Sequence, residues 1–560
     1  MLLAGILPLL SAVAQAGAGH ERPWLALLHY KNGESQADGR GFFLAPAGKT
    51  DPEAELKADL EDPDTQCKFP ARWHWLKKRF NLDVPDKPCP KYEQWRAALD
   101  NSRVSLVYAD AFLNNPASMY GHTFMRLGDR GLLDYTISFA GNPDTENALF
   151  YAIKGLTGAF PGTFSTEPYY MKVQEYNNIE SRDLWEYELN LSTEAREQLL
   201  RHAWEMGSTH FDYYFFSENC SYQLLALLDG ADPDLHLSDS FGFATIPADT
   251  VRAVLSRGVA KPGKYRPSHV REMLALRSLL TPEEIGLAET MPQGRAVVYD
   301  AAYEYRRYRF GFKDAPTDRE LLIARGKLGA PPTEAPVPPR APLEKGHDTA
   351  LWSVGAGASS WGGFEELGYR PGLHDLAADP TGYSESSQLE MGELRVRFDN
   401  REHRPYVERA ALVDIVSLAP WDRWVRKTSW RVSGGVEQAK ELGKAPDSSM
   451  IFDLSPGFGL SAQWGPVLVF GFADADLSAG PALPDGWRFG GGPAAGALLR
   501  GSIWRLLARA SYREFANRSP HQERLQLTNS WTLSRDWELR VTLDRRTPDS
   551  EAGISLLRYF

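Results

Sequence analysis

The chain has 560 residues, which is too long for one compact domain, and at roughly 100–200 residues per domain we expect several units. It is 43% hydrophobic and 24% charged, so it can bury a core and is not a disordered chain. A net charge of −11 argues against a nucleic-acid binder, which needs a basic face to neutralise phosphates. Beyond the N-terminus no long apolar run exists, which excludes a helical membrane bundle but leaves open a β-barrel, whose strands alternate.

The N-terminus predicts export. Residues 1–16 form an apolar stretch that ends in Ala14-Gln15-Ala16, a small-x-small cleavage site typical of a signal peptide, although no Lys or Arg precedes it. In an exported chain Cys67 and Cys89 are expected to form a disulfide. Closing a loop of this size stabilises the folded state by about 3 kcal/mol in the chain-entropy model. Cys220 is then left alone, either as a reactive thiol or as a small buried hydrophobe.

The first half of the chain predicts mixed helix and strand. Residues 21–100 read as an α-rich subdomain with a helix around Trp73–Phe80. Residues 102–191 alternate short β-like runs with Gly- and Pro-containing loops. Helices are expected over Thr193–Met206 and again between Ala248 and Met291. A domain over residues 101–295 follows from this pattern.

The second half predicts a barrel. A connecting segment, residues 296–346, includes six prolines between Pro331 and Pro342 and marks a domain boundary. From residue 347 to 560 we count about twelve alternating segments, such as Trp537–Asp544, which is typical of an antiparallel β-barrel. The many Arg residues on the polar face, Trp and Tyr near segment ends and the terminal Phe560 favour an outer-membrane barrel over a soluble β-domain. An even strand count would put both barrel ends, and everything before them, on the periplasmic side.

Two stretches carry candidate chemistry. In residues 113–127, His122 enters a predicted strand directly after a Gly turn, and in residues 213–225 the pair Asn219-Cys220 opens a predicted helix. The first turn of a helix favours an anion, and a neighbouring imidazolium would lower the thiol pKa further. The backbone N–H of Cys220 would be free to bind an oxyanion. This pattern indicates a thiol nucleophile.

These stretches resemble the bacterial Lnb N-terminal periplasmic domain family. The resemblance covers most of residues 22–290, and the family commonly continues into a β-barrel. Further stretches that carry it are Arg182–Tyr187, Trp24–Tyr30, Phe42–Pro46 and Cys67–Arg72. The family is similar to circularly permuted papain-like hydrolases, a superfamily with cell-wall peptidases and lecithin–retinol-type acyltransferases. The resulting fold class is α+β, with a permuted papain-like half followed by an antiparallel barrel.

The resemblance implies roles for individual residues. Cys220 would be the nucleophile and His122 the base. A third polar residue should orient the imidazole, and Ser138 and Asp134 on the following strand are the candidates. The residues expected to line the substrate site are Asn114, Asn115, Tyr120 and Asn219.

The predicted function is hydrolysis or acyl transfer at amide or ester bonds of the cell envelope, from the outer membrane with the N-terminal half in the periplasm. Peptidoglycan peptides come first as substrate, and acyl groups of lipids or lipoproteins second. The alternatives are a non-catalytic binding or assembly factor and a conduit gated by the periplasmic domain. No HExxH motif or CxxC pair suggests a metal, so neither metal nor cofactor is predicted. The expected partners are outer-membrane lipid and either peptidoglycan or lipoproteins, not nucleic acid.

Overall fold

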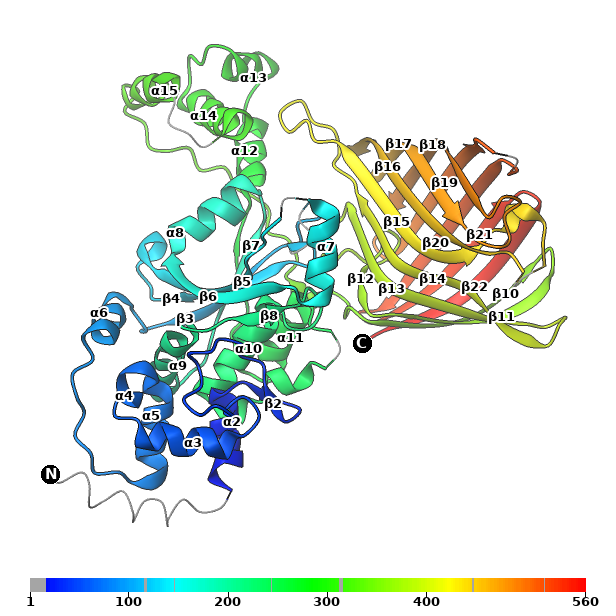
Figure 1. Cartoon of the computed structure of the whole chain (residues 1–560). Helices are drawn as coiled ribbons and strands as arrows, with labels where there is room; N and C mark the ends of the chain where they lie inside the picture. The colour runs from blue at the N-terminus through cyan, green and yellow to red at the C-terminus, as the bar shows by residue number, and fades with distance from the viewer. Residues whose placement is uncertain are drawn as a thin grey trace. The chain divides into compact units, whose positions relative to one another are not determined.

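The structure is a computed structural model that describes residues 17–114, 118–145, 147–242, 244–311, 316–445, 448–517 and 519–560. It divides into two compact units, residues 1–268 (unit 1) and 269–560 (unit 2), which Figure 1 colours along the chain. The predicted signal peptide, residues 1–16, lies outside the described residues. No helix in the described ranges is both long and apolar enough to cross a membrane.

Unit 1 is built on one antiparallel sheet of seven strands in the order β8-β6-β5-β4-β3-β7-β9. Its strands are β3 Val104–Ala109, β4 His122–Leu127, β5 Tyr135–Gly141, β6 Phe160–Pro168, β7 Leu184–Glu188, β8 Phe211–Tyr213 and β9 Lys264–Arg266. Every residue of β3 is buried, and nearly every residue of β4, because these two strands lie in the middle of the sheet. The sheet therefore places the start of β4 inside the domain.

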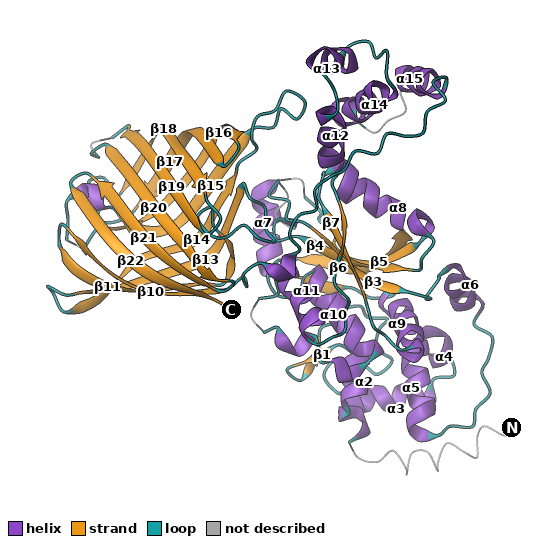
Figure 2. Cartoon of the chain, turned by 180° about the vertical axis from the view of Figure 1, so that it is seen from behind, coloured by secondary structure: helices purple, strands orange, loops and turns teal. Residues whose placement is uncertain are grey.

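Helices flank this sheet (Figure 2). They are α2 Arg22–Leu27, α3 Pro52–Glu61, α4 Thr65–Lys68, α5 Pro70–Phe80, α6 Pro90–Ala98, α7 Ala148–Thr157, α8 Tyr169–Lys172, α9 Thr193–Met206, α10 Cys220–Ala231 and α11 Pro247–Ser256, with a π-helical turn, η5, over Val173–Ile179. All twelve residues of α10 are buried, and this helix packs against α9 and against β4 and β5. Because α10 is buried on every side, it is the central helix of the unit.

The N-terminal helices are joined to this core by a disulfide and by buried charges. Cys67 and Cys89 form the predicted disulfide, which connects α4 to the start of α6. The Arg72 guanidinium lies 3.0 Å from a Glu55 oxygen, and the backbone N–H groups of Ala71 and Arg72 donate to Glu205 on α9. Burial raises the pKa of Glu205 to about 7. These paired groups connect residues 17–100 to the sheet domain.

Unit 2 begins with four helices, α12 His269–Ser278, α13 Pro282–Glu289, α14 Ala296–Phe310 and α15 Pro316–Gly326. They pack around Trp424, which comes from the connection between two barrel strands. The Trp424 indole N–H donates to Glu289, and Arg277 forms a two-pronged ion pair with Asp422 at 2.6 Å. The helices α12 and α13, predicted within residues 101–295, thus group with the barrel half of the chain.

Twelve strands in the described residues close into an antiparallel barrel, as the alternation predicted (Figures 1 and 2). They are β10 Leu351–Ser359, β11 Gly362–Arg370, β13 Ser387–Asp399, β14 Arg404–Ser417, β15 Ser429–Gln438, β16 Met450–Trp464, β17 Val467–Ala479, β18 Trp487–Arg500, β19 Trp504–Phe515, β20 Gln522–Ser534, β21 Trp537–Arg546 and β22 Asp549–Tyr559. Closure comes from the pairing of β10 with β22 and of β11 with β13, and a short extra strand, β12 Gly372–His374, also pairs with β13.

The two faces of the barrel wall differ in chemistry. On β13, Leu394 and Phe398 are exposed, whereas Arg397 between them is buried and forms ion pairs with Glu366 and Glu551. Most of the other strands likewise expose large apolar side chains. An apolar outside with a charged inside is the arrangement of a membrane-spanning barrel, whose backbone polar groups are all paired.

Candidate active site

Cys220 is the first residue of α10, and Asn219 holds it there. Asn219 Oδ1 accepts hydrogen bonds from the backbone N–H groups of Ser221 and Tyr222, at 3.0 and 3.3 Å. Its Nδ2 donates to the carbonyls of Phe215 and Thr245. Asn219 was predicted to line the substrate site, but its Oδ1 caps α10 and its Nδ2 bonds to two carbonyls outside the helix. It therefore positions Cys220.

His122 begins strand β4, directly after a turn that requires glycine. Gly121 has φ +100°, and a Cβ added there would lie 2.5 Å from the Tyr108 ring. The tight turn therefore delivers His122 to the start of a central strand, as the sequence predicted.

The start of β4, which carries His122, lies against the first turn of α10, which carries Cys220. The backbone N–H of Thr123, the residue after His122, hydrogen-bonds to the Cys220 thiol. The Thr123 hydroxyl lies 2.9 Å from the Ser221 hydroxyl, so the start of β4 and the first turn of α10 are joined twice. Cys220 is 2% exposed and His122 is 5% exposed. The predicted pair is therefore buried, not displayed in an open cleft.

Two further residues belong to this site, and neither was predicted as a site residue. The Tyr176 ring centre lies 5.1 Å from the ring of His122, and the Arg182 guanidinium lies 5.1 Å from the same Tyr176 ring. Arg182 is buried and donates to the carbonyl of Ala109, the residue that pairs with His122 across the sheet. In the sequence Arg182 stands two residues before strand β7, and only the fold brings it close to His122.

The protonation states follow from burial. Burial raises the pKa of the Cys220 thiol, although hydrogen bonds from Thr123 and Ser221 oppose this. Burial, with Arg182 and Lys172 nearby, lowers the pKa of His122 well below its usual value. At neutral pH the site therefore holds a neutral thiol and a neutral imidazole. The sequence analysis expected a lowered thiol pKa, but loss of solvent outweighs the helix N-terminus here.

Tyr213 is a third addition to the site. Its hydroxyl hydrogen-bonds to the backbone of Cys220, so that backbone N–H is not free as the sequence analysis expected. Burial raises the pKa of Tyr213 well above its usual value, which keeps its proton in place. A protonated phenol beside the helix N-terminus is a hydrogen-bond donor for an oxyanion.

The candidates for the orienting residue have other partners. The Ser138 hydroxyl lies 3.1 Å from the Ser165 hydroxyl, and Asp134 forms an ion pair with Arg126 at 2.7 Å. Within the described residues, His122 Nε2 has no hydrogen-bond partner.

The residues expected to line the site differ in their surroundings. Tyr120 is buried, and its ring centre lies 5.6 Å from that of Phe216, which belongs to the segment before Cys220. The Tyr120 hydroxyl has no hydrogen-bond partner in the described residues. Asn114 lies exposed in a turn, and Asn115 falls outside the described residues. Among the described residues, no group of His, Cys, Asp and Glu could hold a metal ion.

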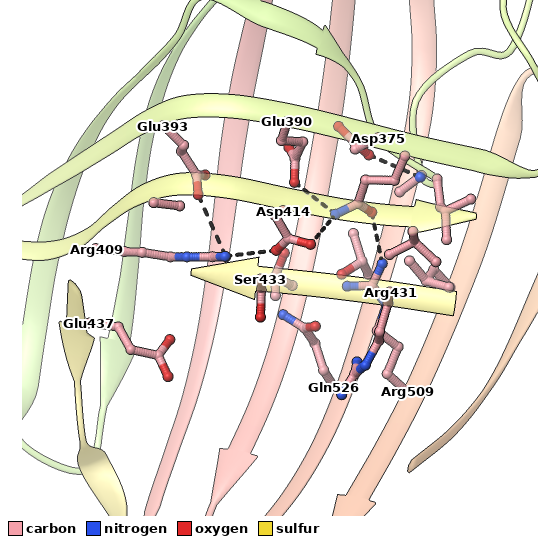
Figure 3. Close-up of a pocket in the computed structure, with 18 of the residues that line it drawn as sticks. Asp375, Glu390, Glu393, Arg409, Asp414, Arg431, Ser433, Glu437, Arg509 and Gln526 are labelled. Atoms are coloured by element: carbon pink, nitrogen blue, oxygen red, sulfur yellow. Dashed lines mark hydrogen bonds and ion pairs between the residues drawn. The ribbon is translucent and has the colours of Figure 1, made fainter. Parts of the chain in front are cut away.

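The barrel interior contains a second concentration of charged groups (Figure 3). A cavity of about 260 Å³ is lined by charged and polar side chains from facing strands. Arg409 lies between Asp414, at 2.7 Å, and Glu393, at 3.6 Å, as the dashed lines in Figure 3 show. Acidic and basic groups are therefore paired along the lumen wall, on one strand and between neighbouring strands.

A segment that follows β11 folds into this lumen at the end where the chain enters the barrel. Asp375 lies 3.1 Å from both Arg370 and Arg540. Leu376 and Ala377 are buried in an apolar cluster with side chains of the barrel wall, including Phe470 and Leu498. Residues 371–383 thus narrow the lumen, which explains the small cavity.

Comparison with known families assigns most of the chain. Residues 91–257 match the Lnb N-terminal periplasmic domain, residues 340–559 a domain of unknown function (DUF7840) and residues 19–79 another (DUF7843). No curated protein matches the chain.

Several porins are among the solved structures that resemble this chain. A KdgM porin in complex with disordered oligogalacturonate is 8% identical, covers 38% of this chain and 99% of its own, and has a TM-score of 0.25. A NanC porin is 8% identical, covers 37% of this chain and 99% of its own, and has a TM-score of 0.25. A bacterial polysaccharide outer membrane secretin is 12% identical over 38% and 99%, with a TM-score of 0.23. Likenesses at this level carry no functional argument.

The closed barrel with its apolar outer surface and the periplasmic domain before it place this protein in the bacterial outer membrane, with its N-terminal half in the periplasm. Both His122 and Cys220 lie in the segment that matches the Lnb N-terminal periplasmic domain family.

Proposed function

We propose that this protein is a thiol-dependent hydrolase or acyltransferase that acts on amide or ester bonds of the cell envelope. The observation that carries this proposal is the hydrogen bond from Thr123, the neighbour of His122, to the Cys220 thiol. This contact supports a nucleophile at a helix N-terminus with His122, from the adjoining strand, as its base, and His122 Nε2 has no partner among the described residues.

The geometry suggests general-base catalysis instead of a preformed thiolate. When a substrate carbonyl approaches, His122 accepts the thiol proton as the Cys220 sulfur bonds to the carbonyl carbon. Tyr213, whose hydroxyl accepts the backbone N–H of Cys220, donates its own proton to the oxygen that becomes negative. Collapse of the intermediate expels the amine or alcohol, which takes its proton from His122. Water or an acceptor amine then attacks the thioester and frees Cys220.

Two substrate classes fit this chemistry. Stem peptides of peptidoglycan lie in the compartment that unit 1 occupies, and they supply amide bonds. Acyl groups of lipids or lipoproteins are the second class. The aromatic surroundings of Cys220, with Tyr176, Tyr213 and Phe215 buried nearby, favour an apolar acyl chain over a charged peptide.

In this proposal the barrel is an anchor. The alternative, a conduit gated by the periplasmic domain, needs a continuous lumen. Residues 371–383 occupy that lumen at one end, and ion pairs such as Arg370–Asp375 hold them in place. The barrel would then serve to keep unit 1 at the membrane.

The test is capture of the acyl-enzyme on the full-length protein in nanodiscs. An activated ester, p-nitrophenyl butyrate, should release p-nitrophenolate in a burst and leave one butyryl group on Cys220, located by peptide mass spectrometry. Cys220→Ala should abolish the adduct. His122→Gln should slow acylation by roughly 100-fold or more, the usual contribution of a general base.

The variant Tyr213→Phe tests the oxyanion role, with Tyr187→Phe as its control. Both remove the hydroxyl of a buried tyrosine of the same sheet domain, but only Tyr213 contacts Cys220. We expect slower acylation by roughly 100-fold for Tyr213→Phe, as for loss of an oxyanion donor, and little change for Tyr187→Phe. Peptidoglycan sacculi and phospholipid vesicles, offered separately, then identify the acyl group that Cys220 accepts. If the wild-type protein forms no adduct, a binding or assembly factor is favoured. The same holds if the adduct forms at the same rate in His122→Gln as in the wild type.

A further inference from the structure

Helix α7, Ala148–Thr157, has an exposed apolar side. Phe150 is 58% exposed, Ile153 46% and Leu156 51%. These residues are three apart, so at 100° per residue they lie within a 120° arc on one side of the helix. They are large side chains on a regular helix, not scattered loop residues, and such a surface marks an interaction site.

The opposite side of α7 fixes it to the domain. Tyr151 and Gly155 fall about 160° from the centre of the exposed arc by the same helical geometry. The Tyr151 ring lies 5.3 Å from Phe160 and 5.4 Å from Phe215. Gly155 has no room for a side chain, since a Cβ there would lie 2.2 Å from the Phe215 ring. The helix therefore cannot turn its apolar side inward without losing these contacts.

We propose that this side of α7 inserts into the periplasmic leaflet of the outer membrane. Three observations favour lipid as the partner over another protein. Unit 1 is joined through residues 269–350 to a barrel that lies in that membrane, so it is tethered to a lipid surface. The helix carries one charged residue, Lys154, and no acidic one. Its apolar residues form a narrow side on a short helix, which suits shallow insertion at the head-group boundary.

Lys154 lies where an interfacial helix needs a cation. It is about 100° from the centre of the apolar arc by helical geometry, at the border between the two sides. Its ammonium forms an ion pair with Asp144 at 2.7 Å, and this pair is partly exposed. A lysine in that position can reach a lipid phosphate while the apolar side is buried.

The contact would also be coupled to the thiol site. The backbone N–H of Phe215 donates to the Gly155 carbonyl at 2.8 Å, and Phe215 in turn accepts from Asn219, which caps the helix of Cys220. A membrane-bound α7 would therefore hold the segment in front of Cys220. The insertion itself does not depend on the proposed chemistry.

The experiment measures the depth of α7 in a bilayer. Full-length protein carrying Cys220→Ser and Ile153→Cys is labelled with an environment-sensitive fluorophore and placed, one copy per disc, in nanodiscs of phosphatidylethanolamine and phosphatidylglycerol. Lipids brominated along the acyl chain serve as quenchers. The control is Lys57→Cys on α3, an exposed position on another helix of unit 1.

We expect the fluorophore at position 153 to be quenched by brominated lipid and the one at position 57 to be unaffected. Replacing Phe150 and Leu156 together by Ser should reduce the fraction of molecules with α7 inserted in the bilayer by roughly tenfold or more. The reason is that two large apolar side chains would no longer move from water into lipid. Thermal melting should show that this variant remains folded. Quenching at position 153 no greater than at position 57 would overturn the proposal. So would a signal that arises only with two copies per disc, which would indicate self-association.

Discussion

Asn219 makes four hydrogen bonds that hold the start of α10, and its replacement by Ala tests whether they fix the position of Cys220. The variant loses the helix cap, worth about 1 kcal/mol. It also leaves the buried carbonyls of Phe215 and Thr245 without their donor, at about 1 kcal/mol or more each. We therefore expect a loss of about 3 kcal/mol in the free energy of unfolding of unit 1.

A matched control is available on the neighbouring helix. Ser192 caps α9 by accepting one hydrogen bond, from the backbone N–H of Ala195, and its side chain forms no other hydrogen bond among the described residues. Ser192→Ala should therefore cost only about 1 kcal/mol. A further variant, Asn219→Asp, keeps the cap oxygen but replaces the donor by a second acceptor that faces two carbonyls. It should be destabilised about as much as Asn219→Ala.

The assay uses the Cys220 thiol as a reporter specific to unit 1. Cys220 is buried and is the one cysteine outside the disulfide, so its reaction with a thiol reagent in increasing urea reports the unfolding of this unit and not of the barrel. With a slope of about 1–3 kcal/mol per molar urea, Asn219→Ala should lower the midpoint by about 1 M or more. Ser192→Ala should lower it by about a third as much. If Asn219→Asp had the same urea midpoint as the wild type, the two carbonyl contacts would not stabilise unit 1 as argued.

Three other outcomes follow from the structure. Alkylation of Cys220 by iodoacetamide should have its midpoint above the free-thiol pKa of about 8.5, because burial raises the thiol pKa, and a midpoint near 6 by mass spectrometry would contradict this. In planar bilayers the barrel should give no sustained conductance, since residues 371–383 narrow the lumen at one end; stable open channels would show that this segment leaves the lumen. Replacing both Cys67 and Cys89 by Ser should destabilise unit 1 by about 3 kcal/mol in the urea assay, given their separation of 22 residues, and an unchanged midpoint would mean that the ion pairs of Arg72 suffice.

The architecture was readable from the sequence because it depends on local patterns. Alternation of polar and apolar residues with period two predicted the barrel strands, since a strand in a barrel wall has one face toward lipid and one toward the lumen. The helix over Thr193–Met206 was predicted with the bounds that the structure has. Asn before Cys220 and Gly before His122 predicted a helix start and a turn, because a cap and a positive φ each need only a few neighbouring residues.

The surroundings of the thiol were decided by tertiary structure. Tyr176, Arg182 and Tyr213 come from three separate elements, and no local pattern in the sequence relates them to His122 or Cys220. The direction of the Cys220 pKa shift also depended on the fold: the sequence showed a helix N-terminus, which lowers a thiol pKa, but only the packed structure showed how completely the site is removed from water. In the same way the alternating strands specified a barrel but not the segment inside it, because the lumen exists only after twelve strands have closed. Short-range hydrogen bonding and periodicity are written into neighbouring residues, whereas desolvation and charge pairing between distant segments arise only when the chain is folded.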